Sequence, residues 1–482
     1  MLKEILNSLK IFRDKIYHFF HHRQDAAMDL LDSLSSNIQA KSVVELSLNP
    51  LHRRNYCSIT RVLGEFYSLS NEKEEKEKVK ARQNQVLTKL LSEYCPQVQE
   101  RLYHVFGVDC TSNPRVFSPT LANRSFVHSP NPVSGNKPIT IGHQYSIAAY
   151  LPEKAMGMPP WLIPLSCERV NTDQKGAILG MQQLSSCIQA QKSFKKSLCV
   201  SVGDCAYSSP ECLAEAQKNS NQVHISRARN NRNFYYPLPK KQGMNPRGRP
   251  KRYGKKHDLS DKTTWGVPDQ RVEFEINQNG KMQKIEIECW NSLIMRGNRK
   301  SKASDYPFRL FRVRVYKLSG ELLFKKPLWL LASGERRIEL SLQDVFNVYR
   351  QRFDLEHFFR FGKNRLLMDK AQTPEVDHEE AWWQFCIIAY VQLYLAREFA
   401  DHVVNPWEKY LPVFHQSTSE KSPTQVQKDF ARIIRQFGTP AQSPKPRKKS
   451  SGRKKGEKQK KRKRHEVIFK KQISENSVVM TL

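Results

Sequence analysis

The sequence of residues 349–363 is YRQRFDLEHFFRFGK, and its spacing says more about the fold than any other segment. At 100° per residue, Tyr349, Arg352, Glu356 and Lys363 fall within an arc of about 60° on a helix. Leu355, Phe358, Phe359 and Phe361 lie on the opposite side. An ordinary i,i+4 ion pair accounts for Arg352 and Glu356, but not for the phenol and the lysine in the same stripe. The stretch predicts a helix with one face packed inward and an acid flanked by bases on the other.

Two apolar segments upstream each end in an aspartate. Val105–Val108 precedes Asp109, and Leu198–Gly203 precedes Asp204. Both segments are typical of buried strands, and residues at strand ends emerge at the edge of a sheet. For either aspartate alone, capping of a turn is the simpler interpretation. Together with the acid on the later helix, they form a candidate carboxylate site.

Three other acids are weaker candidates for this site. Asp354 lies about 160° from Glu356 around the helix. Asp305 lies in a Ser- and Lys-rich loop without a preceding strand. Asp173 follows a strand-like segment and is a reserve for the first aspartate.

The hydrophobic pattern changes several times along the chain, from helical spacing to strands and back to helical spacing from Ser341 onward. We expect five segments: a helical N-terminal domain over 1–100; the first part of an α/β core over 101–228; a basic, β-rich insertion over 229–332; the helices that complete the core over 333–412; and a linker with a disordered basic tail over 413–482.

The pattern Tyr-x2-Arg-x3-Glu-x6-Lys resembles the signature of a group of bacterial insertion-sequence transposases of the DDE type. Tyr349, Arg352, Glu356 and Lys363 match it position for position. The segments around Asp109 (Val-Asp-Cys-Thr) and around Asp204 (Gly-Asp-Cys-Ala-Tyr) are similar to the family's first and second aspartate segments. The resemblance covers about residues 100–400 and implies an RNase H-like mixed sheet interrupted by the β-rich insertion.

The resemblance also implies a chemistry. Asp109, Asp204 and Glu356 would hold two Mg²⁺ ions, with Mn²⁺ as a substitute, because hard carboxylate oxygens suit these metals. Two such ions activate a nucleophile and stabilise the leaving oxygen in phosphoryl transfer.

Other side chains would then contact DNA. Arg352, Lys363 and Tyr349 would bind phosphates near the scissile bond. Trp329 is the candidate for stacking on a flipped base at the element end, and packing in the core is its alternative.

Charge identifies the class of partner independently. The chain of 482 residues carries a formal net charge of +33. Residues 445–464 hold thirteen Lys or Arg and one acid, which predicts a tail that grips polyanions. Arg247 and Arg249 lie in an Arg-Gly-Arg-Pro segment that resembles the core of an AT-hook, with a phosphate-binding loop as the alternative. Such a charge favours a nucleic-acid partner.

The sequence contains no run of 18 apolar residues that could span a membrane, and the first residues lack the pattern of a secretory signal. We therefore expect a cytoplasmic, nucleoid-associated protein without a membrane partner.

The first hypothesis is a DNA transposase that binds terminal inverted repeats, cuts there and joins the ends to target DNA, as a homodimer in the synaptic complex. A non-catalytic or domesticated DNA-binding protein is the alternative, since the basic segments alone would suffice for it. A nuclease with the same core and no strand transfer is a third possibility.

Overall fold

The computed structural model describes most of the chain. The described residues are 2–67, 73–129, 134–154, 158–238, 252–278, 280–297, 303–401 and 421–446, with 452, 455–456, 458 and 461–469. Arg247 and Arg249 lie outside the described residues, as does much of the basic segment 445–464.

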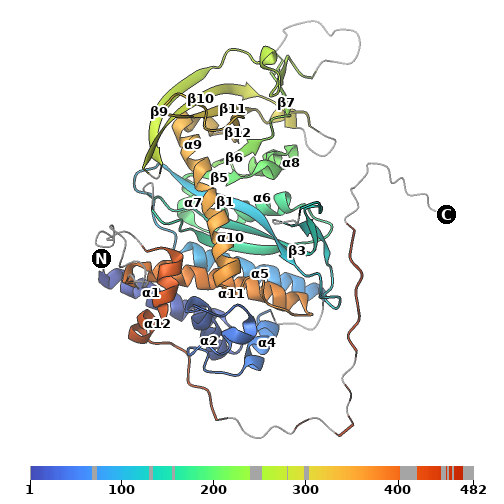
Figure 1. Ribbon diagram of the computed structural model, residues 1–482, viewed down its shortest axis with the longest axis vertical. Helices are drawn as coiled ribbons and strands as arrows, with labels where there is room; N and C mark the ends of the chain where they lie inside the picture. The colour runs from blue at the N-terminus through green and yellow to red at the C-terminus, as the bar shows by residue number, and fades with distance from the viewer. Residues whose placement is uncertain are drawn as a thin grey trace, which may run out of the picture.

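A mixed β-sheet forms the centre of the molecule (Figure 1). Its first six strands in chain order are β1 (Tyr103–Pro114), β2 (Ser125–His128), β3 (Ile139–Tyr150), β4 (Ile163–Val170), β5 (Leu198–Gly203) and β6 (Gln222–Ala228). β1, β5 and β6 run parallel, while β3 pairs antiparallel with β1, β2 and β4. This mixed α/β arrangement is consistent with the expected RNase H-like core.

The β-rich insertion is bonded directly to this sheet. Its strands are β7 (Asn233–Tyr235), β8 (Lys256–Asp258), β9 (Gln270–Gln278), β10 (Lys281–Leu293), β11 (Phe308–Lys317) and β12 (Leu328–Ser333). β12 pairs antiparallel with β6, and β11, β10 and β9 follow in order, so the insertion lengthens the central sheet. β7 and β8 form a separate two-stranded sheet.

Helices cover the sheet on its two faces (Figure 1). Those within the core are α6 (Gly176–Gln189), α7 (Lys192–Lys196), α8 (Pro210–Ala216), α9 (Leu342–Gln351) and α10 (Phe353–Arg365). Short 3-10 turns are η1 (Cys205–Ser208), η2 (Lys262–Thr264), η3 (Ala303–Asp305), η4 (Arg337–Glu339) and η5 (Arg397–Phe399). α9 begins at the expected place, because Ser341 and Asp344 form a capping box.

The N-terminal region is helical, as expected, and shares one hydrophobic core with the C-terminal helices and the sheet. Its helices are α1 (Leu2–Phe19), α2 (Gln24–Ser35), α3 (Val43–Leu46), α4 (Tyr56–Glu65) and α5 (Lys73–Ser92), and its later neighbours are α11 (Val376–Ala396) and α12 (Pro423–Phe437). α11 is apolar nearly all round and is buried accordingly. Phe20 stacks on its Phe385 at 5.2 Å between ring centroids.

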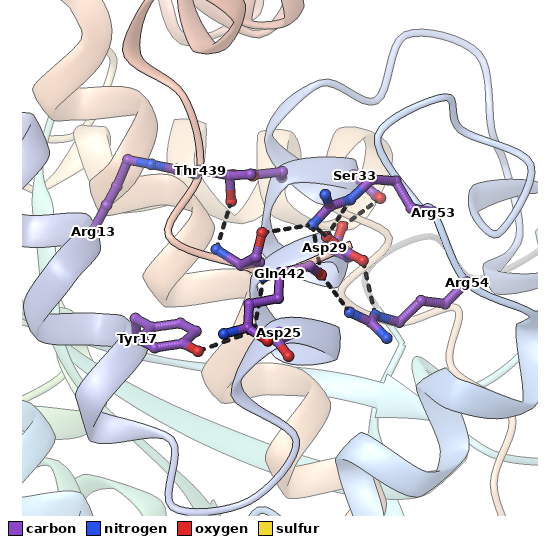
Figure 2. Close-up of polar contacts among 11 residues, drawn as sticks. Arg13, Tyr17, Asp25, Asp29, Ser33, Arg53, Arg54, Thr439 and Gln442 are labelled. Atoms are coloured by element: carbon purple, nitrogen blue, oxygen red, sulfur yellow. Dashed lines mark hydrogen bonds and ion pairs between the residues drawn. The ribbon is translucent and has the colours of Figure 1, made fainter. Parts of the chain in front are cut away.

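Charged residues on α2 and in the loop before α4 hold the chain that follows α12 (Figure 2). Buried Asp29 accepts hydrogen bonds from both Arg53 and Arg54. Arg54 Nη2 also donates to the carbonyl of Gln442 at 3.0 Å, and the Gln442 amide donates to Asp25 Oδ1 at 2.9 Å. These contacts fix the exit point of the basic C-terminal segment against α2.

Residues that follow the basic segment contact the edge of the sheet. Ile468 forms a parallel bridge with Ser125 at the start of β2. The Ile468 amide donates to the carbonyl of Arg124 at 2.8 Å, and Phe469 contacts Phe126 at 5.2 Å between centroids. The contact has a simple physical reason, because an edge strand offers unpaired backbone groups to an extended segment within reach.

Buried Glu379 ties α11 to the end of β1. Its carboxylate lies 2.7 Å from His143 Nδ1 and accepts hydrogen bonds from Arg115 Nε at 2.7 Å and Tyr145 Oη at 2.9 Å. Burial by itself would raise the pKa of Glu379. The hydrogen bond with His143 and the charge of Arg115 outweigh burial and lower this pKa to about 2.

Candidate active site

Parallel strands bring the two predicted aspartates together. β1 pairs with β5 so that Gly107 lies opposite Val202, and continuing this register by two residues sets Asp109 beside Asp204. Each aspartate also satisfies a local amide: Asp109 Oδ1 accepts from Cys110 N, and Asp204 Oδ1 accepts from Ala206 N, both at 2.8 Å. The turn-capping interpretation fits Asp204, which is the N-cap of η1. It does not fit Asp109, because that residue lies within β1, which continues to Pro114 rather than ending at the aspartate.

A glycine on β1 brings the third acid close. α10 crosses β1 (Figure 1). At Gly107 on β1, a β-carbon would lie 2.8 Å from Leu355 Cδ1 on α10. The missing side chain lets the fully buried Leu355 sit directly on the strand. Glu356, the next residue, keeps 48% of its side chain exposed at the same edge as Asp109. Asp204 and Glu356 both lie near enough to Asp109 for their charges to act on its carboxyl group.

Arg352 links two of these acids. Its Nη1 lies 3.2 Å from Asp109 Oδ2, and its Nη2 lies 2.7 Å from Glu356 Oε1. The predicted helix over 349–363 runs through this residue: α9 stops at Gln351 and α10 begins at Phe353, but the backbone of Arg352 itself is helical, with φ −51° and ψ −31°. The bridging side chain is therefore anchored on helical backbone.

The negative charges of the three acids repel one another, and this repulsion is visible in the pKa of Asp109. Burial raises the pKa of Asp109 to about 7, with further contributions from the charges of Asp204 and Glu356. Arg352 and the Cys110 amide oppose the shift without cancelling it. Carboxylates that repel one another in this way form a binding site for positive charge.

The oxygen donors fit a hard divalent ion, but their positions do not yet enclose one. Among the described residues, no three acid, histidine or cysteine side chains converge closely enough to hold a metal. The guanidinium of Arg352 lies between Asp109 and Glu356, where an ion bound by both would have to lie. The donor chemistry therefore fits Mg²⁺ or Mn²⁺ once that guanidinium has moved.

Comparison with known families agrees with this geometry. The sequence pattern of the family described as DDE superfamily endonuclease matches residues 16–288, more than half of the chain. The chain belongs to this family. The matched range includes Asp109 and Asp204 and ends before α10, so the match does not cover Glu356. A comparison with curated proteins finds no match.

Membership of the family settles the broad chemistry. DDE superfamily endonucleases act on DNA and in general use divalent metal ions. No helix among the described residues is both long and apolar enough to span a bilayer. The carboxylate edge of this DDE endonuclease is therefore its candidate active site.

The remaining signature residues are less exposed than the helical pattern suggested. Tyr349 is only 5% exposed, and burial raises the pKa of its hydroxyl. Lys363 is half-buried and donates from Nζ to the carbonyl of Ser112 at 2.9 Å, while burial lowers its pKa. Tyr349 and Lys363 do not belong to an exposed face, because the side of α9 and α10 that carries them packs against the sheet. Glu356 alone keeps a largely open side chain.

Trp329 is packed in the protein interior and is not exposed to a DNA base. It is 1% exposed on β12 and lies in a second hydrophobic cluster under the insertion. Trp265 contacts it edge-on at 5.1 Å between centroids, and Trp290 lies 5.9 Å away. Its contacts are those of the core-packing alternative, and a base would reach this ring only after Trp265 had moved.

Two arginines that sequence reasoning missed lie beside the acids. β5 pairs with β6 so that Gly203 faces Ser226, and the next residues in this register are Asp204 and Arg227. Arg227 belongs to β6 and is exposed. Arg229 is exposed too, and a hydrogen bond with Cys205 and the charge of Asp204 raise its pKa. Only the parallel register could have revealed them, since a basic residue after a strand is unremarkable in so basic a chain.

The rival acids lie elsewhere. Asp354 is buried on the far side of α10 and accepts a hydrogen bond from Lys154 at 2.7 Å. Asp173 is exposed in the loop after β4, and Asp305 belongs to η3 in the insertion. None of them joins the carboxylate edge, in agreement with their low ranking from sequence.

Proposed function

We propose that the chain is a DNA transposase that binds the terminal inverted repeats of its element, cuts there, and joins the 3′ ends to target DNA. One observation carries the proposal. Asp109 and Asp204 are aligned on adjacent parallel strands, and Glu356 on α10 is joined to the first of them through Arg352. This is the residue set expected of the family signature, assembled from three distant parts of the sequence.

In this proposal Asp109, Asp204 and Glu356 hold two divalent ions, Mg²⁺ or Mn²⁺. Such ions, when bound, activate the attacking hydroxyl and stabilise the leaving oxygen of a phosphodiester. The protein contributes a rigid frame, because two of the acids belong to the sheet and the third to a helix packed on it. Rigid placement of reacting groups is the main protein contribution to phosphoryl transfer.

Basic side chains around the acids position the DNA in this proposal. Arg227 and Arg229 are open at the same edge and would bind backbone phosphates, for which arginine is geometrically suited. Arg352 and Lys363 would join them after exchanging their present protein partners for phosphate oxygens. Tyr349 would support Arg352, whose guanidinium carbon lies 5.9 Å from its ring centroid.

Other parts of the proposal concern the larger assembly. Arg247 and Arg249, together with the basic segment 445–464, add charge for holding DNA outside the active site. Synapsis of two element ends favours a homodimer on the DNA. The N-terminal helices would then recognise the ends.

The decisive experiment uses the protein with duplexes that carry the element's own terminal sequences, in Mg²⁺ or Mn²⁺. Defined breaks at those ends, lost in Glu356→Gln, would support the proposal. Glu339→Gln is the matched control, because this exposed carboxylate precedes α9 and pairs with Arg336 away from the acids. Cleavage without joined products would indicate a nuclease alone. Tight binding without cleavage in either metal would indicate the non-catalytic DNA-binding protein.

A further inference from the structure

Arg352 occupies an unusual position for a residue that is expected to bind DNA. Its side chain is 10% exposed, and its two terminal nitrogens contact carboxylates from different elements, Asp109 on β1 and Glu356 on α10. The guanidinium is thus committed to the acids in the absence of DNA. Its Nε is buried without a hydrogen-bond partner, so the side chain retains an unused donor.

We propose that Arg352 is an internal counter-ion that must leave Asp109 and Glu356 before a divalent ion binds, and that a DNA phosphate draws it away. Metal loading and DNA binding would then be coupled through this one side chain. The inference rests on the proposed function, because it takes these carboxylates as the metal site.

The first step of the argument is competition. A divalent ion held by Asp109 and Glu356 needs the oxygens that Arg352 now contacts. With the guanidinium in place, two positive groups would share a half-buried site about 3 Å apart, where charges repel strongly. The guanidinium and the metal therefore exclude one another.

The second step is the exchange. A phosphate offers arginine two oxygens in the same planar arrangement as a carboxylate, so Arg352 loses no hydrogen bonds when it changes partner. The exchange needs only rotation of the side-chain torsions, because the backbone of Arg352 is helical, with φ −51° and ψ −31°. The exposed ring of Phe353 lies 5.3 Å from the guanidinium carbon and can support it outside the acid cluster.

The consequence is an order of events. Free protein binds metal weakly, and protein on DNA binds it well, so metal loads where there is a substrate. Because the coupling is an equilibrium one, metal must strengthen DNA binding by the same factor.

The test measures Mn²⁺ binding to the full chain by electron paramagnetic resonance, with no DNA present. Arg352→Gln should bind Mn²⁺ on the order of tenfold more tightly than wild type or better, since a unit charge beside two carboxylates has been removed. Arg360→Gln is the matched control, because it removes the same charge from an exposed position of the same helix and should leave the affinity unchanged. Adding Glu356→Gln to Arg352→Gln should abolish the gain.

Circular dichroism establishes that each variant is folded. If Arg352→Gln is not, Arg352→Lys serves instead, because a single ammonium cannot bridge both acids and should give a smaller gain. Wild type bound to a duplex should show tighter, Glu356-dependent Mn²⁺ binding. An unchanged affinity in a folded Arg352 variant, beside Glu356-dependent binding by the wild-type complex, would overturn this inference alone. An absence of Glu356-dependent binding in every form would overturn the proposed function with it.

Discussion

Replacing Gly107 by alanine should push α10 away from β1, so that cleavage is strongly reduced while the protein still folds. The added carbon would lie 2.8 Å from Leu355 Cδ1 and 3.2 Å from Leu151 Cδ1. Carbon atoms rest at about 3.5–4.0 Å, so one side must yield by roughly 1 Å. Leu355 is fully buried, and Leu151 blocks part of its escape, so we expect the helix that carries Glu356 to move. The overpacking should cost about 1–3 kcal/mol of stability.

The assay compares urea unfolding with metal-dependent cleavage of element-end DNA. A displacement of about 1 Å at Glu356 should reduce cleavage on the order of a hundredfold in Gly107→Ala. Adding Leu355→Ala removes the clash but leaves a cavity, so cleavage should recover in part while stability falls by a further ~2–5 kcal/mol. If the double variant cleaves better than Gly107→Ala while being less stable, the contact between residue 107 and Leu355 must control the position of Glu356.

A control comes from the N-terminal helices. Gly64→Ala on α4 also creates a close contact, with its new carbon 2.9 Å from His378 Nε2 on α11, and it touches neither α10 nor β1. It should be destabilised and still cleave. Wild-type cleavage by Gly107→Ala, or a double variant no better than the single one, would refute the idea that this contact positions Glu356.

Three further predictions concern charge. The pKa of Glu379 is about 2 in the folded protein against 4.5 for the free group, so the ionised carboxylate stabilises the fold fully above pH 4.5, and this stabilisation is lost as the pH falls toward 2. Urea titrations across this pH range should show a loss of about 3 kcal/mol in the free energy of unfolding of the wild type, and a much smaller loss in Glu379→Gln. Arg227→Gln and Arg229→Gln should each lower the slope of log affinity against log salt by about 1, in anisotropy titrations with duplex DNA. The pKa of Asp109 lies at about 7 without metal, so Mn²⁺ affinity should weaken by about tenfold for each pH unit below 7, and a flat profile would exclude this group as a ligand.

The sequence was most informative where local pattern and chemistry coincide. Asp204 follows the apolar segment that forms β5, Asp109 lies within β1, and the helical spacing predicted from Ser341 onward begins α9 there. The family signature selected Glu356 over its helix neighbour Asp354, and the structure brings Glu356 beside Asp109 while Asp354 pairs with Lys154. These features depend on residues close together in the chain.

What the sequence missed depends on packing between distant segments. The exposure of Tyr349 and Lys363 was overestimated, because a helical pattern shows which residues share a face but not what covers it. Arg227 became visible only when β6 was aligned with β5. Extension of the sheet by β12 likewise rests on a pairing between residues about 100 positions apart, which no local periodicity encodes.

That pairing explains how the insertion can bear on the active site. Arg227 lies on a strand bonded on one side to β5, which leads into Asp204, and on the other to β12, where Leu330 is its partner. From β11, Arg309 Nη1 donates to the carbonyl of Leu340 at 2.7 Å, just before α9 begins. The insertion therefore holds both the strand that carries Arg227 and the start of the helices that carry Arg352 and Glu356. A force on β9–β12 would reach the acids through hydrogen-bonded ladders rather than through a flexible linker, so the insertion and the carboxylate edge should respond to DNA as one body.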